Sequence, residues 1–139
     1  MKNKKISSII VILTVIFTAL IAISVSGCSI YKLNLPKLEN IKSISIEQNA
    51  NELVIDSGDE MENLLSLLNG NGRTTKTASV QDAPVNADKV LKVNFNFVET
   101  GVSTLFVYQK NGKYYIEQPY NGIFQISADD YIGIEGIIS

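Results

Sequence analysis

From residue 41 onward, hydrophobic and polar residues mostly alternate with the period of β-strands. Ile41–Gln48 places Ile44 and Ile46 on one face and polar side chains on the other, which predicts a half-buried strand. The run from 90 to 98 alternates in the same way, with Leu91, Val93, Phe95 and Phe97 expected to point inward and Lys92, Asn94 and Asn96 outward. Further strands are predicted at 52–56, 103–110, 113–118 and 123–126, with a possible one at 74–80.

A helical period interrupts these strands once. Met61, Leu64, Leu65 and Leu68 are spaced three or four residues apart, which predicts one amphipathic helix. Ser57 or Asp59 can cap its N-terminus, and the segment 69–72 (NGNG) is expected to end it. The tail 127–139 begins like a capped helix but contains two glycines, so we expect only a short, weak helix there.

The turns between the predicted strands indicate how they pair. Asn111-Gly112 separates two strand runs and is the sequence most typical of a tight hairpin. Pro119–Gly122 (PYNG) predicts a second turn. The predicted fold class is therefore α+β, with an antiparallel meander sheet packed against one amphipathic helix and a short C-terminal helix.

The first 28 residues have a different composition. Three lysines in the first five residues precede an uncharged, mostly apolar run, Ile6–Val25, and small residues lead to Cys28. This order is typical of a secretory signal, which we assign to residues 1–27. The run is also long enough to span a bilayer, so an uncleaved signal anchor is the alternative.

Val25-Ser26-Gly27-Cys28 resembles the lipobox of bacterial lipoproteins. The resemblance implies a lipid on the Cys28 sulfur, cleavage after Gly27, and a protein held in the cell membrane by that lipid and facing outside the cytoplasm. Residues 28–40 include Pro36 and lack a clean period, so we interpret them as a tether, and residues 41–139 as a single extracytoplasmic domain.

The composition excludes several kinds of chemistry. The chain has no histidine and one cysteine, which excludes Ser-His-Asp and Cys-His arrangements and zinc sites of the Cys/His type. We expect no metal and no cofactor. The residues after position 27 have a net charge of −5, which argues against nucleic acid as a partner. Carboxylates remain, and Glu117 with Asp82 or Asp129 is the pair that an enzyme acting on cell-wall material would use.

Tyrosines are concentrated near the second predicted turn. Tyr108, Tyr114, Tyr115 and Tyr120 fall within thirteen residues. On a strand, Tyr115 and Glu117 share one face, and a face with tyrosine and an acid is suited to binding a protein, peptide or glycan. The candidate binding residues are Ser79, Asp82, Pro84, Tyr115, Glu117, Pro119, Tyr120 and Gly122. The alternative is that some rings cap the core and that Gly122 only turns the chain.

A family resemblance rests on two of these segments. Thr75 with Ser79–Pro84 (SVQDAP), and Lys113–Phe124 (KYYIEQPYNGIF), resemble an uncharacterised domain of exported proteins in Gram-positive bacteria, domain of unknown function family 5301. The similarity covers roughly residues 41–131. It implies a location outside the cytoplasm and an architecture, and it carries no activity.

Three functions follow from these observations, each with a structural requirement. A non-enzymatic binding or sensing module requires the Ser79–Pro84 loop and the Pro119–Gly122 turn to lie near each other. A carboxylate-dependent enzyme requires two carboxyl groups roughly 5–9.5 Å apart in a cleft. A spacer subunit of an envelope complex would be supported by a broad apolar patch on the free face of the sheet.

Overall fold

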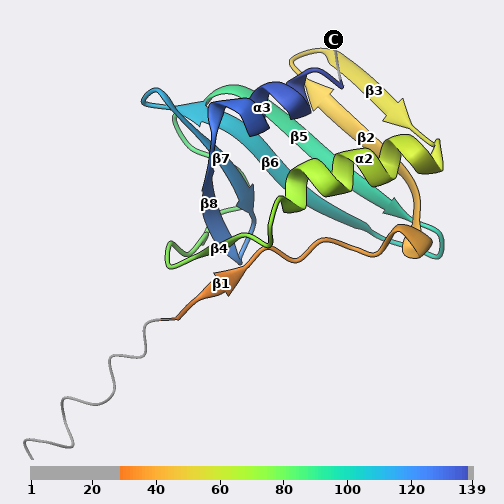
Figure 1. Cartoon of the computed structure of the whole chain (residues 1–139), viewed down its shortest axis with the longest axis horizontal. Coiled ribbons are helices and arrows are strands. Elements are labelled where there is room, and N and C mark those ends of the chain that lie inside the picture. Colours follow the sequence, from red (N-terminus) through yellow and green to blue (C-terminus); the bar gives the residue numbers. More distant parts are fainter. Residues whose placement is uncertain (1–28, 138–139) are drawn as a thin grey trace, which may run out of the picture.

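The computed structural model describes residues 29–137, so the predicted signal peptide 1–27, Cys28 and residues 138–139 lie outside the described part. A six-stranded antiparallel sheet and two helices make up most of it, which confirms the α+β prediction (Figure 1). In chain order the elements are β1 (Tyr31–Lys32), the 3₁₀ helix η1 (Leu38–Asn40), β2 (Ile41–Gln48), β3 (Asn51–Ile55), α2 (Gly58–Asn69), β4 (Thr74–Thr75), β5 (Asp88–Phe97), β6 (Val102–Lys110), β7 (Lys113–Gln118), β8 (Gly122–Ile126) and α3 (Ala128–Glu135).

The sheet has the strand order β3-β2-β5-β6-β7-β8, and every neighbouring pair is antiparallel. Strands β5 to β8 form the predicted meander, and β2 and β3 form the predicted hairpin. Asn111 and Gly112 connect β6 and β7 with φ values of 52° and 74°, the pair of positive φ angles that a type I′ hairpin turn requires. The register that follows puts Tyr108 opposite Tyr115.

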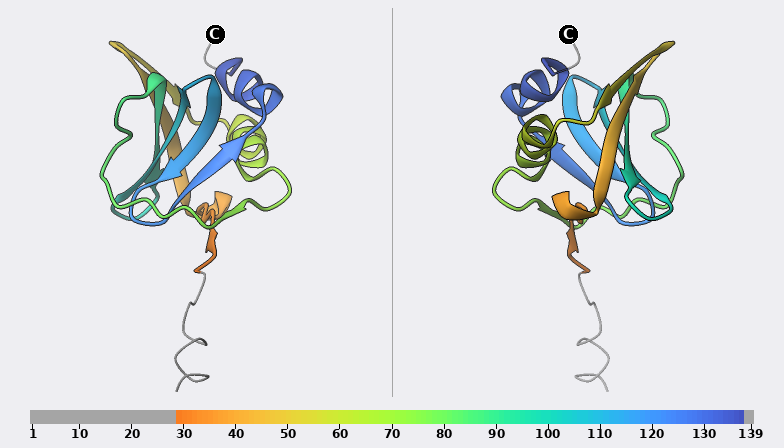
Figure 2. Two further views of the ribbon diagram at one scale, coloured as in Figure 1. Left: turned by 90° about the vertical axis from the view of Figure 1, so that its left-hand side faces the viewer. Right: turned by 90° about the vertical axis from the view of Figure 1, so that its right-hand side faces the viewer.

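One face of the sheet packs against both helices (Figure 2). The predicted inward residues Leu91, Val93 and Phe95 are buried there, whereas Phe97, at the end of β5, is only half-buried. From the helices the core receives Met61, Leu64, Leu68, Tyr131 and Ile134. Within residues 29–137, neither helix has the length and apolar composition needed to span a bilayer.

The caps predicted for the helix ends are confirmed in part. Ser57 stands at the N-cap of α2, but its side chain makes no capping hydrogen bond. Gly70 follows the last residue of α2 with a φ of 51°, as the predicted stop requires. In α3, the Ser127 hydroxyl accepts a hydrogen bond from the Asp130 N–H, and the Asp130 carboxylate accepts one from the Ser127 N–H. This reciprocal capping box starts the short C-terminal helix that the sequence predicted.

Arg73 joins the two helices. Its Nε donates to the Leu68 carbonyl oxygen (2.7 Å) and its Nη2 to that of Leu67 (3.1 Å), in the last turn of α2. Its guanidinium also pairs with the Asp130 carboxylate of α3 at 3.3 Å. Burial alone would raise the pKa of Asp130, but the hydrogen bonds from Ser127 and the nearby Arg73 charge lower it below its ordinary value.

The predicted tether, residues 28–40, is largely part of the domain, which is a correction to the sequence analysis. Residues 31 and 32 form β1 on β4, and residues 38–40 form η1. The Leu33 side chain is buried in the core, and the Leu33 N–H donates to the Arg73 carbonyl oxygen at 3.0 Å. The physical reason is that Leu33, Leu35 and Leu38 pack against the hydrophobic core. Their partners are distant in the sequence, so a periodic pattern within residues 28–40 could not reveal these contacts. The packed domain therefore begins near Tyr31 and not at Ile41.

The possible strand 74–80 is also much shorter than expected. Only Thr74 and Thr75 form β4, and beyond them Ala78 makes an isolated bridge to Gly122. The chain from 76 to 87 then runs as a loop on the side of the sheet away from the helices, the green segment in Figure 2. It positions the residues that the sequence singled out for binding.

Candidate functional site

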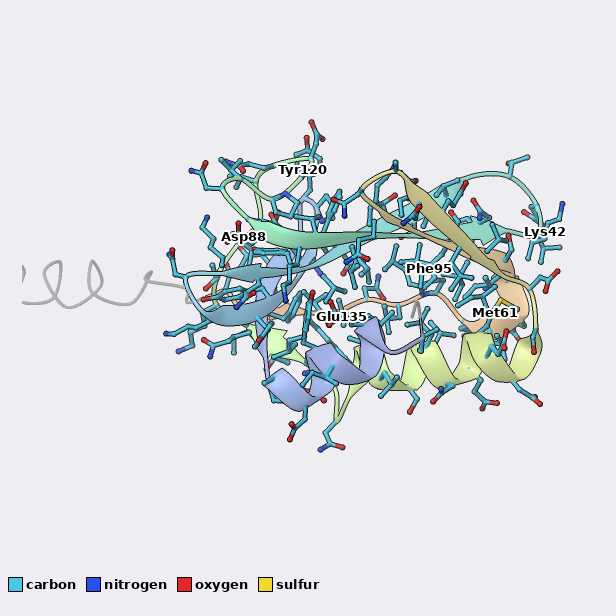
Figure 3. The ribbon with its side chains drawn as sticks, turned by 90° about the horizontal axis from the view of Figure 1, so that it is seen from above. Lys42, Met61, Asp88, Phe95, Tyr120 and Glu135 are labelled. Carbon is cyan, nitrogen blue, oxygen red and sulfur yellow. The ribbon has the colours of Figure 1, made fainter. Side chains whose placement is uncertain are left out.

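The Ser79–Pro84 loop and the Pro119–Gly122 turn meet, as the binding hypothesis required. The Ser79 N–H donates to the Asn121 carbonyl oxygen (3.3 Å), and the Ile123 N–H donates to the Thr77 carbonyl oxygen (2.9 Å). Figure 3 shows Tyr120, in this turn, on the side of the sheet away from α2 and α3. We call the surface formed by residues 77–84 and 119–123 the loop–turn junction.

A buried carboxylate fixes the base of the junction. Glu117 is only 3% exposed, and its two oxygens accept hydrogen bonds from the Ser79 hydroxyl (2.7 Å) and the Tyr108 hydroxyl (3.1 Å). A buried carboxylate is tolerated only when such bonds replace its hydration. Burial, followed by the negative charge of Glu117, raises the pKa of Tyr108 well above its ordinary value, so its hydroxyl stays a donor. Ser79 therefore holds the loop down on β7.

The tyrosines divide between the two faces of the sheet. Tyr115 shares the outer face with Glu117, as predicted, and stacks on Tyr108 with ring centroids 5.6 Å apart. Tyr114 faces the helices and stacks on Tyr131 of α3 at 4.5 Å. Burial, and after it the neighbouring Glu135 carboxylate, raises the pKa of Tyr131 to about 12. Three of the four clustered rings therefore pack against other rings or inside the fold, and Tyr120 differs.

Tyr120 is exposed and has an unusual backbone conformation. A hydrogen bond from the Asn121 N–H to the Gln118 carbonyl oxygen (3.0 Å) closes the turn, with Pro119 second and Tyr120 third. The φ of Tyr120 is 57°, which makes this a type II turn, whose third position normally holds glycine or asparagine. The Tyr120 hydroxyl donates a short hydrogen bond to Asp82 across the junction, and this bond raises the pKa of Tyr120.

The remaining candidate residues are less accessible. Gly122 is buried, and its φ lies outside the left-handed region, so it does not serve to turn the chain. It allows close packing instead, since a Cβ at this position would lie 2.8 Å from the Thr75 Cγ2 and 3.0 Å from the Tyr31 Cβ. Pro84 and Pro119 are half-buried. Asp82 and Tyr120 are thus the fully exposed members of the predicted set.

The sequence analysis missed the residues that tie the N-terminal segment to this turn. The Asn34 N–H donates to the Gln118 side-chain oxygen (3.0 Å), and the Gln118 amide donates back to the Asn34 carbonyl oxygen (2.8 Å). The Asn121 amide donates to the Lys32 carbonyl oxygen at 2.8 Å. Lys32, Asn34, Gln118, Pro119 and Asn121 line a shallow hollow of about 300 Å³. Their polar character was visible, but nothing local links residues more than 80 positions apart.

The carboxylates that the enzyme hypothesis would use lie in different surroundings. Glu117 is enclosed, with both oxygens bonded to hydroxyls, whereas Asp82 is exposed on the loop. Asp129 lies in the first turn of α3, on the helix side of the sheet. Among residues 29–137, no three Asp, Glu, Cys or His side chains gather closely enough to hold a metal ion.

The free face of the sheet is largely polar along β2, β5 and β6. The Asn94 side chain donates to Glu47 at 2.7 Å and accepts from the Thr104 hydroxyl at 2.9 Å. The Asn96 amide donates to the Ser43 hydroxyl at 3.2 Å. These cross-strand bonds cover β2, β5 and β6 with a polar ladder, which does not favour a broad hydrophobic interface.

A comparison with protein families finds a match to a domain family. A family model named DUF5301, with the description "Domain of unknown function (DUF5300)", matches residues 29–125. The match includes the N-terminal segment 29–40 and both parts of the loop–turn junction, and it ends before α3. No curated protein and no solved structure matches the chain.

Proposed function

The chain belongs to domain of unknown function family 5301, and from this premise we propose that it is a membrane-anchored, non-enzymatic binding or sensing module outside the cytoplasm. The basic start, the apolar run and the lipobox-like Val25–Cys28 support export and a lipid on Cys28. A lipid anchor of two or more chains holds a protein stably on a bilayer. The loop–turn junction is the proposed binding surface.

The observation that carries this proposal is the conformation of Tyr120. A non-glycine residue in the left-handed region costs roughly 1–2 kcal/mol. Tyr120 is 69% exposed, so burial within the domain contributes little to offset that cost. A large aromatic side chain held in this way is explained by contact with something outside the domain, since tyrosine offers a large contact area with few rotatable bonds.

The base of the junction supports the same conclusion. Ser79, Glu117 and Tyr108 form a buried network in which each polar group has a partner, and such networks hold neighbouring backbone rigidly. The start of the loop that carries Asp82 is therefore fixed beside the turn that carries Tyr120. A prearranged surface loses less entropy when it binds a partner.

Photo-crosslinking in intact cells tests the binding surface. A photoreactive residue at Val80 lies in the junction, and the same residue at Ile132 on α3 is a matched control, since both side chains are well exposed. We expect adducts of defined mass from position 80 and none from position 132. Tyr120→Asn, which suits a left-handed position, should remove most of the adduct without lowering the melting temperature. Identical adducts from both positions would contradict the proposed site.

Metabolic labelling tests the anchor separately. Cells given a clickable fatty acid should label the full-length protein, and Cys28→Ser should lose the label. A Ser29→Ala variant is the control, because it changes the neighbouring residue and keeps the sulfur. An unlabelled wild-type protein would contradict the lipid anchor and favour the signal anchor formed by residues 6–25, and label retained in Cys28→Ser would show that Cys28 is not the lipid site.

A further inference from the structure

The chain enters the domain beside the loop–turn junction. β1 begins at Tyr31, two residues after the first described residue, and lies at the lower end of the domain in Figures 1 and 2. Tyr31 packs against Gly122, and the Lys32 carbonyl oxygen accepts the hydrogen bond from the Asn121 amide (2.8 Å). The turn that carries Tyr120 is therefore adjacent to the point where any N-terminal anchor is attached.

The remaining connection is short. Three peptide units separate Cys28 from Tyr31, which allows at most about 10 Å even when fully extended. If the apolar run ending at Val25 were the anchor instead, six units would allow about 20 Å. Either anchor keeps β1 close to the headgroup layer, which is roughly 5–8 Å thick on each side of a bilayer.

The N-terminal segment also prevents the domain from swinging freely about β1. Leu33 is buried in the core, and paired hydrogen bonds join Asn34 to Gln118 at the start of the turn. The position of β1 thus sets the position of the turn. This rigid link places the loop–turn junction, and not the helices, nearest to the bilayer.

The exposed side chains at this end have the chemistry of a membrane contact. Ile30, Val80 and Tyr120 are 66%, 76% and 69% exposed, and two exposed lysines adjoin them, Lys32 in β1 and Lys76 directly after β4. Tyrosine is enriched at the headgroup level, and lysines can keep their ammonium groups in water while their stems lie on apolar surface. Asp82, the acidic residue of the junction, already accepts a hydrogen bond from the Tyr120 hydroxyl.

We infer that this end of the domain, with Ile30, Val80, Tyr120, Lys32 and Lys76, docks on the phospholipid headgroup layer of the membrane that carries the anchor. The inference rests on the proposed function and names the partner of the same junction. The membrane is favoured over a soluble protein, peptide or glycan because the short connection already holds this surface against the bilayer.

Fluorescence quenching tests the contact, because the chain contains no tryptophan. Full-length Val80→Trp and Ile132→Trp proteins, purified from membranes, are reconstituted into phosphatidylcholine–phosphatidylglycerol vesicles with or without brominated acyl chains. A side chain seated at the boundary of headgroups and chains lies within reach of the bromines, so we expect roughly a twofold loss of Val80→Trp emission. Ile132→Trp, on α3, should keep its emission.

Flotation of the same vesicles separates the two proposals. Protein that floats with the vesicles, with Val80→Trp quenched and Ile132→Trp unquenched, supports the docked domain. Floating protein in which neither tryptophan is quenched overturns the docking and leaves the anchored module standing. Protein that does not float overturns both. In the photo-crosslinking experiment, a lipid adduct at position 80 supports the inference, and a protein or glycan adduct there overturns it.

Discussion

Replacing Gly122 by alanine would place a methyl group where other atoms already lie. An ideal Cβ at this position is 2.8 Å from the Thr75 Cγ2, 3.0 Å from the Tyr31 Cβ and 3.1 Å from the Phe124 Cζ. The Cβ of Tyr31 cannot rotate away, because it belongs to a strand paired with β4. The alanine methyl must therefore displace β1 and β4 relative to β8.

Forcing an extra methyl group into a packed site costs typically 1–3 kcal/mol. For a domain of this size, each kcal/mol lowers the melting temperature by roughly 4–8 °C. Urea unfolding of Gly122→Ala, followed by circular dichroism, should show the lower midpoint with an unchanged slope. Gly58→Ala is the matched control, since no atom lies within 4 Å of its added Cβ and its φ is ordinary. We expect that variant to be neutral or up to about 1 kcal/mol more stable.

A double-mutant cycle identifies the contact. Thr75→Ser removes Cγ2, the nearest atom, and keeps the hydroxyl oxygen that accepts a hydrogen bond from the Thr77 N–H at 3.1 Å. The two single variants each lose stability. The double variant Thr75→Ser, Gly122→Ala should lose about 1 kcal/mol less than the sum of those two losses. Additivity to within about 0.5 kcal/mol, or an unchanged midpoint for Gly122→Ala, would refute the close packing assigned to Gly122.

Four further outcomes are expected. Arg73→Met should lower the free energy of unfolding by about 1–3 kcal/mol, because two carbonyls at the end of α2 lose a charged donor, and Arg73→Lys should restore part of it, as urea unfolding would show. The pKa of Asp130 is lower in the folded protein than in the unfolded chain, so ionised Asp130 stabilises the fold above the unfolded pKa. This stabilisation is lost as the pH falls through the folded pKa. Melting temperatures measured across this acid range should therefore change less in Arg73→Met than in the wild type. The pKa of Tyr131 is raised to about 12, so stability should fall as the pH rises from about 10 through 12, and Tyr131→Phe should remove that slope in a pH series of thermal melts. Glu117→Leu should destabilise the protein by about 1–3 kcal/mol, because two buried hydroxyls lose their acceptor, whereas Glu117→Gln should cost less in the same assay.

Local patterns predicted most of the sheet, because alternation and turn chemistry act over a few residues. Asn111-Gly112 supplies both positive φ angles of the β6–β7 turn, and the helical spacing of Met61, Leu64 and Leu68 matches their burial. The N-terminal segment was misread for a different reason. β1 has only two residues, too few to show a period, and its partner in β4 lies more than 40 positions away.

The proximity of the two candidate segments was predicted, and their internal arrangement was not. That the Ser79 loop and the Tyr120 turn should meet was a condition of the binding hypothesis, and the structure meets it. One alternative was that Gly122 only turns the chain. In the structure the positive φ of this turn falls on Tyr120, and the Asn121 side chain bonds Lys32 and Gln118.

Two costs to stability occur at the same place in this domain. Tyr120 holds a left-handed conformation with its ring in solvent, and beneath the loop a carboxylate is buried with two hydroxyls where an apolar cluster could have packed. Well-packed apolar residues are often as stable as a buried polar network or more so. Departures of this kind are expected at functional sites, and the turn that carries Tyr120 lies beside β1, the strand nearest to the proposed anchor. The proposed binding surface explains the strained tyrosine and the buried network together, because each would then serve the same contact with a partner.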